Sequence, residues 1–126
     1  MSGLMWSQRL LNTMQEVKFA LYNGYLMGLP TNENHMVFRW IGPGKVLFSV
    51  TQIGKAASIH FASNKTGLRH FKTACDEFVK YCFFLFPWCK MVIGHVGPKS
   101  IGRLIMKIGF LPLGESDRGT VYVRLP

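Results

Sequence analysis

The segment Ser63–Gly67, of sequence SNKTG, is the first stretch whose residues could bind a ligand. It is a polar, glycine-containing loop between a predicted strand and a predicted helix. The first turn of a helix has backbone N–H groups without helical acceptors, and together with the helix dipole they favour a phosphate group. Lys65 and Arg69 would add positive charge at the same place. The stretch therefore indicates an anion site, although an ordinary turn has the same composition.

Two histidines could take part in proton transfer. His60 lies in a predicted strand and His95 in a later, almost wholly apolar one. A hydrogen-bonded structural role is the other interpretation of a histidine in a strand. The sequence has no specific Ser-His-Asp arrangement and no His and Cys cluster with metal-ligand spacing, so we expect neither a hydrolase triad nor a metal site.

Basic residues form a stripe near the C-terminal end of the chain. Lys99, Arg103 and Lys107 recur at four-residue steps and so share one face of a short predicted helix. This face is either simply solvated or binds anions such as phosphate groups, nucleic acid or an acidic partner. The net charge of +9, from 15 Lys and Arg against six Asp and Glu, favours anionic partners in general. The stripe lacks the interleaved aromatic residues that stack on bases.

The spacing of apolar residues predicts the first elements that would position these groups. Leu10, Met14, Val17 and Leu21 fall on one face of an N-terminal helix. Residues 36–62 then change to the strand pattern, with turn residues between three runs rich in Val, Phe and Ile. One face of the third run consists of apolar side chains, those of Ala57, Ile59 and Phe61. We therefore expect a three-stranded antiparallel meander after the helix.

The strongest helical pattern covers residues 69–86 and ends before Pro87. An apolar strand at residues 89–96 follows, then a short helix closed by Gly109, and then a hairpin around the sequence ESDRG. This order predicts an α+β (mixed α/β) domain, with a mainly antiparallel central sheet flanked by helices, over residues 1–126.

Composition fits a packed protein of one domain, because 48% of the 126 residues are hydrophobic. The three cysteines, Cys75, Cys82 and Cys89, form no CxxC pair, so we expect buried free thiols in a reducing cytoplasm. The first residues lack an uninterrupted apolar stretch typical of a signal peptide. The longest apolar run is far shorter than the roughly 20 residues that span a bilayer, so we expect no membrane partner.

These elements and motifs together resemble the Gcn5-related N-acetyltransferases. In that family a meander leads through a pyrophosphate loop, Gln/Arg-x-x-Gly-x-Gly/Ala, into a long helix. Here Ser63–Gly67 corresponds to the loop, residues 69–86 to the long helix and residues 89–96 to the apolar strand that follows. The segment MKIGF, at the end of the short helix, is similar to the family's LYxKxGF segment. The resemblance covers residues 36–126 in element order.

The resemblance implies a site for acetyl-CoA between the third meander strand and the strand at residues 89–96. The pyrophosphate would lie on the backbone of Lys65 to Arg69. The residues that would bind acetyl-CoA or CoA are Phe61, Ser63, Asn64, Lys65, Thr66, Gly67, Leu68, Arg69 and Lys99.

Several residues depart from the family's pattern. Asn64 stands where the family has Gln or Arg, and Arg69 stands where a Gly or Ala lets the backbone approach the pyrophosphate. The guanidinium of Arg69 would crowd the cofactor or bind its phosphate instead. Ile105 stands where the family often has a Tyr that protonates the leaving thiolate. The strands also lack the family's carboxylate, so the resemblance leaves His60 or His95 as the general base.

We therefore expect an acetyl-CoA-dependent N-acetyltransferase that acts on an amine, located in the cytoplasm. The residues that differ from the family's pattern favour one alternative. It is a catalytically degenerate binding module with the same fold and an acidic protein as its partner. The short chain also resembles small acetyltransferase-like proteins of tailed phages, which would bind a host target in the host cytoplasm or be packaged in the virion. Nucleic-acid binding ranks last, because no nucleic-acid motif accompanies the charge.

Overall fold

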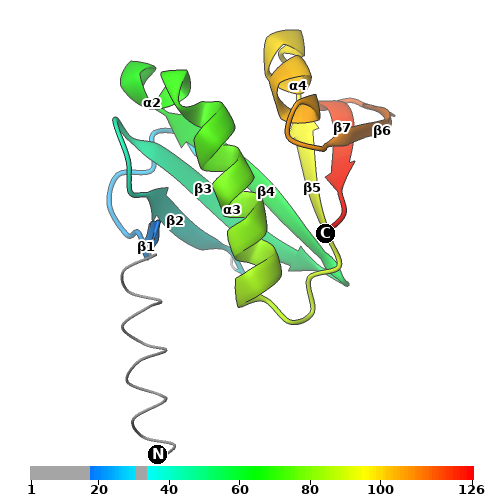
Figure 1. Ribbon diagram of the computed structural model, residues 1–126, viewed down its shortest axis with the longest axis horizontal. Helices are drawn as coiled ribbons and strands as arrows, with labels where there is room; N and C mark the ends of the chain where they lie inside the picture. Colours follow the sequence, from blue (N-terminus) through cyan, green and yellow to red (C-terminus); the bar gives the residue numbers. More distant parts are fainter. Residues whose placement is uncertain (1–17, 31–33) are drawn as a thin grey trace, which may run out of the picture.

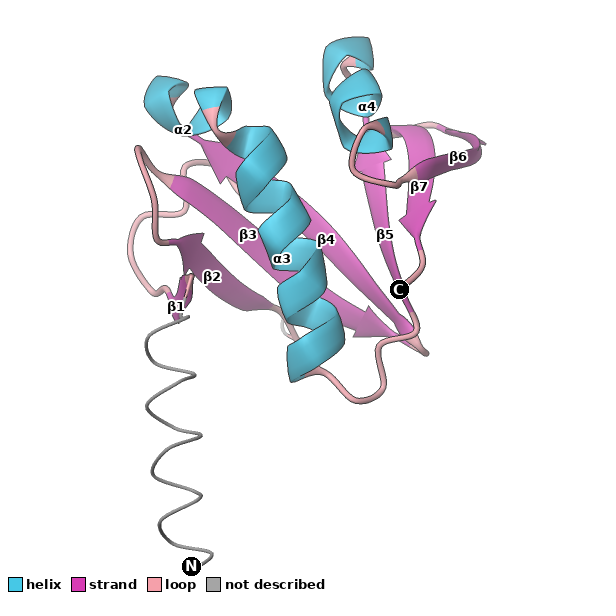
Figure 2. Cartoon of the chain, viewed as in Figure 1, coloured by secondary structure: helices cyan, strands magenta, loops and turns pink. Residues whose placement is uncertain are grey.

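The computed structural model describes residues 18–30 and 34–126 (Figure 1). Strands form one continuous sheet, and the helices lie against one face of it (Figure 2). The elements in chain order are β1 (Phe19–Leu21), β2 (Met36–Trp40), β3 (Val46–Ile53), β4 (Ala56–Ser63), α2 (Lys65–Arg69), α3 (Phe71–Leu85), β5 (Met91–Val96), α4 (Lys99–Met106), β6 (Leu111–Ser116) and β7 (Gly119–Arg124).

The seven-stranded sheet has the order β1-β2-β3-β4-β5-β7-β6. Neighbouring strands are antiparallel except for β4 and β5, which are parallel. The parallel pair follows from the connection, because α2 and α3 carry the chain back to the end of the sheet where β4 began. The predicted α+β fold, with a mainly antiparallel sheet flanked by helices, is confirmed.

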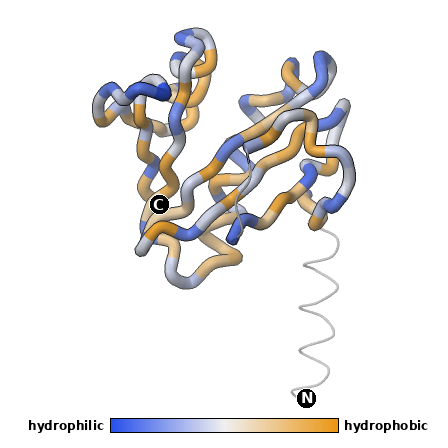
Figure 3. Tube along the Cα trace, turned by 180° about the vertical axis from the view of Figure 1, so that it is seen from behind, coloured by the Kyte–Doolittle hydropathy of each residue, from blue (hydrophilic) through white to orange (hydrophobic). Residues whose placement is uncertain are grey.

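The main core lies between the sheet and α3. Phe78 of α3 is fully buried, and its ring stacks on Phe48 of β3 with 4.4 Å between centroids and 9° between planes. From β4, Ala57 and Ile59 belong to this core and Phe61 packs against it, as the alternation of the strand predicted. Hydrophobic and hydrophilic residues are interspersed along the chain trace (Figure 3), and the strand residues of the main core come mostly from β2, β3 and β4.

All three cysteines are buried and free, as predicted. Burial raises the pKa of the Cys75 thiol to about 12, and it also raises the pKa of Cys82. Both thiols therefore stay protonated at neutral pH and behave as apolar packing groups.

The opposite face of the sheet carries a smaller cluster formed by Leu29, Val37 and Leu47. It is covered by the connection between β1 and β2. Ser49 of β3 donates a hydrogen bond of 3.2 Å from Oγ to the Pro30 carbonyl, which fastens this connection to the sheet. The connection therefore borders the face of the sheet that α3 leaves open.

The predicted N-terminal helix is wrong at its last position. Leu21 pairs with Phe38 in strand β1 and is exposed, whereas Leu10, Met14 and Val17 lie outside the described residues. A strand of three residues is too short to produce a recognisable alternation. Leu21 therefore matched the helical spacing of the residues before it by coincidence.

The boundary between the predicted loop and the long helix also needs correction. Lys65, Thr66 and Gly67 already belong to the short helix α2, and α3 begins only at Phe71, after a break at His70. The short helix α4 starts after Pro98, and Gly109 follows it with a positive φ of 96°, as expected for a glycine that ends a helix. None of the helices in residues 18–30 and 34–126 is long and apolar enough to cross a membrane.

Candidate active site

Strands β4 and β5 separate part-way along their length. Their pairing runs from Ala56 opposite Met91 to Ile59 opposite Gly94. Both strands continue past the last pair, β4 to Ser63 and β5 to Val96, and the ribbons diverge toward α2 and α4 (Figure 1). The sheet is therefore open at its centre.

A cleft of about 150 Å³ occupies this opening. Its lining is mostly apolar. It comes from β3, β4 and β5, from helices α3 and α4, from the segment after α4 and from the connection before β2. The lining residues are Pro30, Phe48, Ile59, His60, Phe61, Phe71, Cys75, Gly94, His95, Val96, Ile101, Ile105 and Phe110.

The position of Gly94 keeps the base of the cleft open. Gly94 is opposite Ile59 in the last pair before the strands diverge. A Cβ placed on Gly94 would lie 3.9 Å from the Ile59 carbonyl oxygen, in ordinary van der Waals contact, so the glycine leaves unfilled a position that a Cβ could occupy. Phe61 lines the cleft without filling it, because its ring packs on Phe71 with 4.1 Å between centroids.

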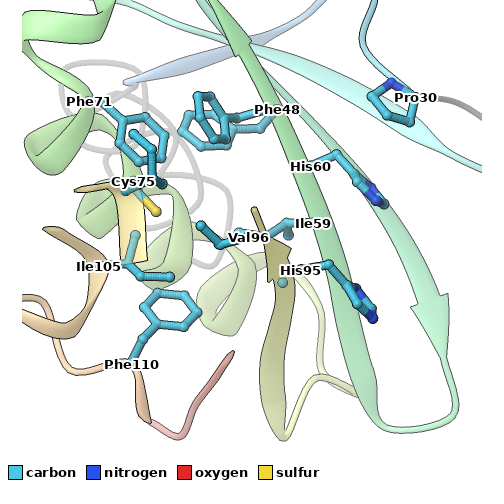
Figure 4. A pocket seen from close by; sticks show the side chains of 13 residues that line it. Pro30, Phe48, Ile59, His60, Phe71, Cys75, His95, Val96, Ile105 and Phe110 are labelled. Atoms are coloured by element: carbon cyan, nitrogen blue, oxygen red, sulfur yellow. The ribbon is translucent and has the colours of Figure 1, made fainter. Parts of the chain in front are cut away.

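His60 and His95 lie beyond the last strand pair, one on each side of the opening. Their rings lie near each other and point away from Phe71 and Phe110 (Figure 4). The pKa of His60 is lowered below 6.5, chiefly by burial and further by the charges of His95 and Arg118. His60 is therefore neutral at physiological pH and can accept a proton.

Asn64 fixes the end of β4 to the hairpin between β2 and β3. Its Oδ1 accepts hydrogen bonds from the backbone N–H groups of Gly67, at 2.8 Å, and Lys45, at 3.0 Å. Its own N–H donates to the Lys45 carbonyl at 3.0 Å. A Cβ on Gly67 would lie only 2.5 Å from that carbonyl oxygen, so the glycine is required for the close approach of the two backbones.

Replacing Asn64 with alanine should lower the free energy of unfolding by about 0.5–2 kcal/mol, because the N-cap of α2 is lost. Thermal unfolding of Asn64→Ala, compared with the parent protein, measures this loss. Asn64→Asp is the matched control, since its carboxylate can accept the same two hydrogen bonds. An unchanged melting temperature for Asn64→Ala would show that the cap adds no stability.

Solved structures with similar folds include spermidine N-acetyltransferases. The spermidine N-acetyltransferase SpeG F149A mutant from Vibrio cholerae aligns with 98% of this chain and 90% of its own, at a TM-score of 0.60 and 14% identity. AAC(6')-Ib in complex with parmomycin and acetyl-CoA aligns with 74% of this chain and 66% of its own, at a TM-score of 0.55 and 16% identity. The fold is that of the Gcn5-related N-acetyltransferases (GNAT fold).

A domain from Methanocaldococcus jannaschii DSM 2661 also shares the GNAT fold, with a TM-score of 0.59 and 15% identity over 76% of this chain and 70% of its own. No protein-family model matches the sequence, and no curated protein does. At these identities the similarity concerns the arrangement of the elements, and the chemistry must be argued from this chain's own residues.

Only some of the predicted site residues meet in the cleft of this GNAT fold. His60, Phe61 and His95 line it together. Ser63 ends β4, and the residues from Asn64 to Arg69 form the cap and body of α2, outside the cleft lining. Lys99 borders a second cavity of about 200 Å³, which Arg103 and Tyr122 also line.

The structure adds residues that sequence reasoning missed. Pro30, Ile101 and Phe110 line the cleft, and Arg118 acts on His60 from the turn between β6 and β7. Their sequence context gives no sign of this, because each reaches the site through the tertiary fold. Ile105 stands at the position where the family often has a proton-donating Tyr, and it presents an apolar side chain to the cleft.

Proposed function

We propose that this chain is an N-acetyltransferase that transfers an acetyl group from acetyl-CoA to an amine, within a single domain of residues 1–126. The observation that carries the proposal is the opening between β4 and β5, which holds an apolar cleft with a neutral histidine at its edge. Acetyl-CoA would supply an acetyl group activated as a thioester.

The size of the cleft fits the acyl end of such a ligand. Pockets that enclose a whole drug-sized molecule have volumes of about 300–1,000 Å³, whereas this cleft has about 150 Å³. The nucleotide part would therefore lie outside, where α2 and α4 stand on either side of the open end (Figure 1). Lys65 and Arg69 on α2, and Lys99 on α4, are exposed and supply positive charge for its phosphates.

His60 is the group we assign as general base. During transfer, a bond forms between the amine nitrogen and the acetyl carbon, the bond from that carbon to sulfur breaks, and the amine proton passes to His60 Nδ1 or Nε2. The thiolate then takes a proton from water, because Ile105 cannot donate one and burial keeps the pKa of Cys75 at about 12. His95 borders the same opening and is the comparison for His60.

Filling the base of the cleft should weaken acetyl-CoA binding with little cost to the fold. We expect Gly94→Val to raise the Kd for acetyl-CoA at least roughly tenfold, which corresponds to about 1.4 kcal/mol, because the new side chain occupies the opening beside Ile59. Isothermal titration calorimetry measures the Kd, and thermal unfolding confirms folding.

The control for this variant is Gly114→Ala, since an added Cβ at that exposed position of β6 meets nothing within 4 Å. Gly114 lies on the edge strand of the sheet and lines neither the cleft nor the second cavity. Equal acetyl-CoA affinity of Gly94→Val and the parent protein would contradict the assignment of the cleft. If the parent protein does not bind acetyl-CoA or CoA at millimolar concentration, the proposed function is wrong.

The apolar wall formed by Ile105 and Phe110 favours a second candidate function. In this second function, the protein keeps the fold without catalytic activity and serves as a binding module. An example would be a phage protein that binds an acidic host protein or is packaged in the virion. This candidate predicts that no amine is acetylated, whether or not CoA is bound. Turnover assays on a protein with measured CoA affinity therefore separate the two functions.

A further inference from the structure

The face of the sheet opposite α3 borders the outer side of the cleft. Ser49, His60, His95 and Val121 share this face, because Ser49 pairs with His60 and His95 pairs with Val121. Pro30 lies on the same side in the close-up view (Figure 4). If the proposed function holds, an acceptor amine approaches the acetyl group from this side, where His60 can take its proton.

The turn between β6 and β7 brings a positive charge to this approach. Gly119 packs so closely on the end of β5 that a Cβ there would lie 2.4 Å from the Val96 carbonyl oxygen. The N–H of Arg118 donates a hydrogen bond of 3.2 Å to Ser116 Oγ, which shapes the turn. The turn that carries Arg118 therefore lies against the end of β5 beside Val96, which lines the cleft, and the Arg118 charge acts on His60.

The two carboxylates of helix α3 already form ion pairs with basic side chains. Asp76 on α3 forms ion pairs with Lys80 at 3.0 Å and Arg124 at 3.1 Å. Glu77 on the same helix pairs with Lys18 at 3.1 Å.

The carboxylates of the terminal hairpin lie at its turn. Glu115 of β6 accepts a hydrogen bond of 2.7 Å from Thr120, and Asp117 is exposed in the turn beside Arg118. The Arg118 guanidinium is a positive charge that acts on His60, and the turn that carries it lies against the end of β5. The approach to the cleft therefore suits an anion better than a second cation.

We infer that the acceptor is a small primary amine that also carries an anionic group, a carboxylate or a phosphate, and that Arg118 binds this group. A guanidinium forms two parallel hydrogen bonds with either anion, which also orients the amine toward His60. A polyamine such as spermidine would instead bring further positive charge to a basic approach. This inference rests on the proposed function and specifies its substrate class.

Matched pairs of acceptors test the inference. The first pair is 4-aminobutyrate and putrescine, which differ by a carboxylate in place of an aminomethyl group. The second pair is O-phosphoethanolamine and ethanolamine, which differ by the phosphate alone. We expect kcat/KM for acetyl transfer to be at least tenfold higher for the anionic member of one pair or both, and the two pairs show whether carboxylate or phosphate is preferred.

Removing the positive charge of the turn should remove the preference. We expect Arg118→Gln to lower the ratio of kcat/KM between the anionic and the matched acceptor at least fivefold. The control is Lys55→Gln, which removes one positive charge from the turn between β3 and β4, at the paired end of β4 and β5, and should leave the ratio unchanged.

The possible outcomes separate this inference from the proposed function. Equal or faster acetylation of putrescine and spermidine overturns the anionic acceptor and leaves the acetyltransferase in place. An unchanged ratio in Arg118→Gln overturns the role of Arg118. Absence of transfer to every acceptor, by a protein that calorimetry shows to bind acetyl-CoA, overturns the proposed function and the inference with it.

Discussion

Replacing His60 with glutamine should lower kcat for acetyl transfer about 10²- to 10⁴-fold, the usual contribution of a general base. Glutamine keeps a polar side chain of similar length but cannot accept the amine proton at neutral pH. Steady-state kinetics at saturating acetyl-CoA measure the loss. His95→Gln is the matched control, because His95 borders the same opening on the neighbouring strand.

The pH dependence provides a second readout for His60. Its pKa lies below 6.5 in the folded protein, mainly because of burial. The rate should therefore rise with pH through this lowered pKa and level off before neutrality. Arg118→Gln should move the rise to higher pH, since it removes a charge that lowers the pKa. A pH profile that His60→Gln leaves unchanged would contradict the role of this residue.

The same lowered pKa has a consequence for stability. The unfolded chain binds a proton at His60 more readily than the folded protein does, so this group favours unfolding as the pH falls from 6.5 toward the folded pKa. The stability that His60 contributes is fully present above pH 6.5 and is lost as the pH falls toward the pKa of the folded protein. In His60→Gln the decrease in melting temperature over this interval should be smaller than in the parent protein.

Replacing Phe78 with alanine should have the largest effect on stability. Phe78 is fully buried and stacks on Phe48 at the centre of the core. Phe-to-Ala changes at such sites cost about 3–5 kcal/mol, a large part of the roughly 5–15 kcal/mol that stabilises a typical domain. Urea unfolding, with the midpoint and slope fitted together, measures the change.

The control for this variant is on the same helix. Phe84 is 74% exposed, so Phe84→Ala removes an equal volume without opening a cavity. Its effect should stay within about 0.5 kcal/mol, as for most surface substitutions. Equal losses in the two variants would mean that the packing of α3 on the sheet contributes little to stability.

The sequence predicted the elements whose patterns are long and local. The alternation of Ala57, Ile59 and Phe61 placed one face of β4 in the core, and the helical spacing from Phe71 onward marked α3. It did not predict the break at His70, where α2 ends close to the point at which Gly67 meets the backbone of Lys45, because that contact exists only in the folded chain. A short-range pattern contains no information about such contacts.

The site was predictable to a smaller degree for the same reason. His60 and His95 were found because they are titratable residues in strands that the family resemblance brings together. The point at which β4 and β5 separate depends on where their pairing ends, between Ile59 and Gly94, and neither residue reveals it in sequence. Arg118 was missed because a charged residue in a turn is usually solvated.

The short pairing of β4 with β5 also has a consequence for how the protein folds. Its residues are separated in sequence by the whole of α2 and α3, whereas β2 and β3, β3 and β4, and β6 and β7 are joined by short turns. Long-range pairing costs more chain entropy and forms more slowly than hairpins. We therefore expect this pairing, and the cleft that begins where it ends, to be assembled late on the folding pathway.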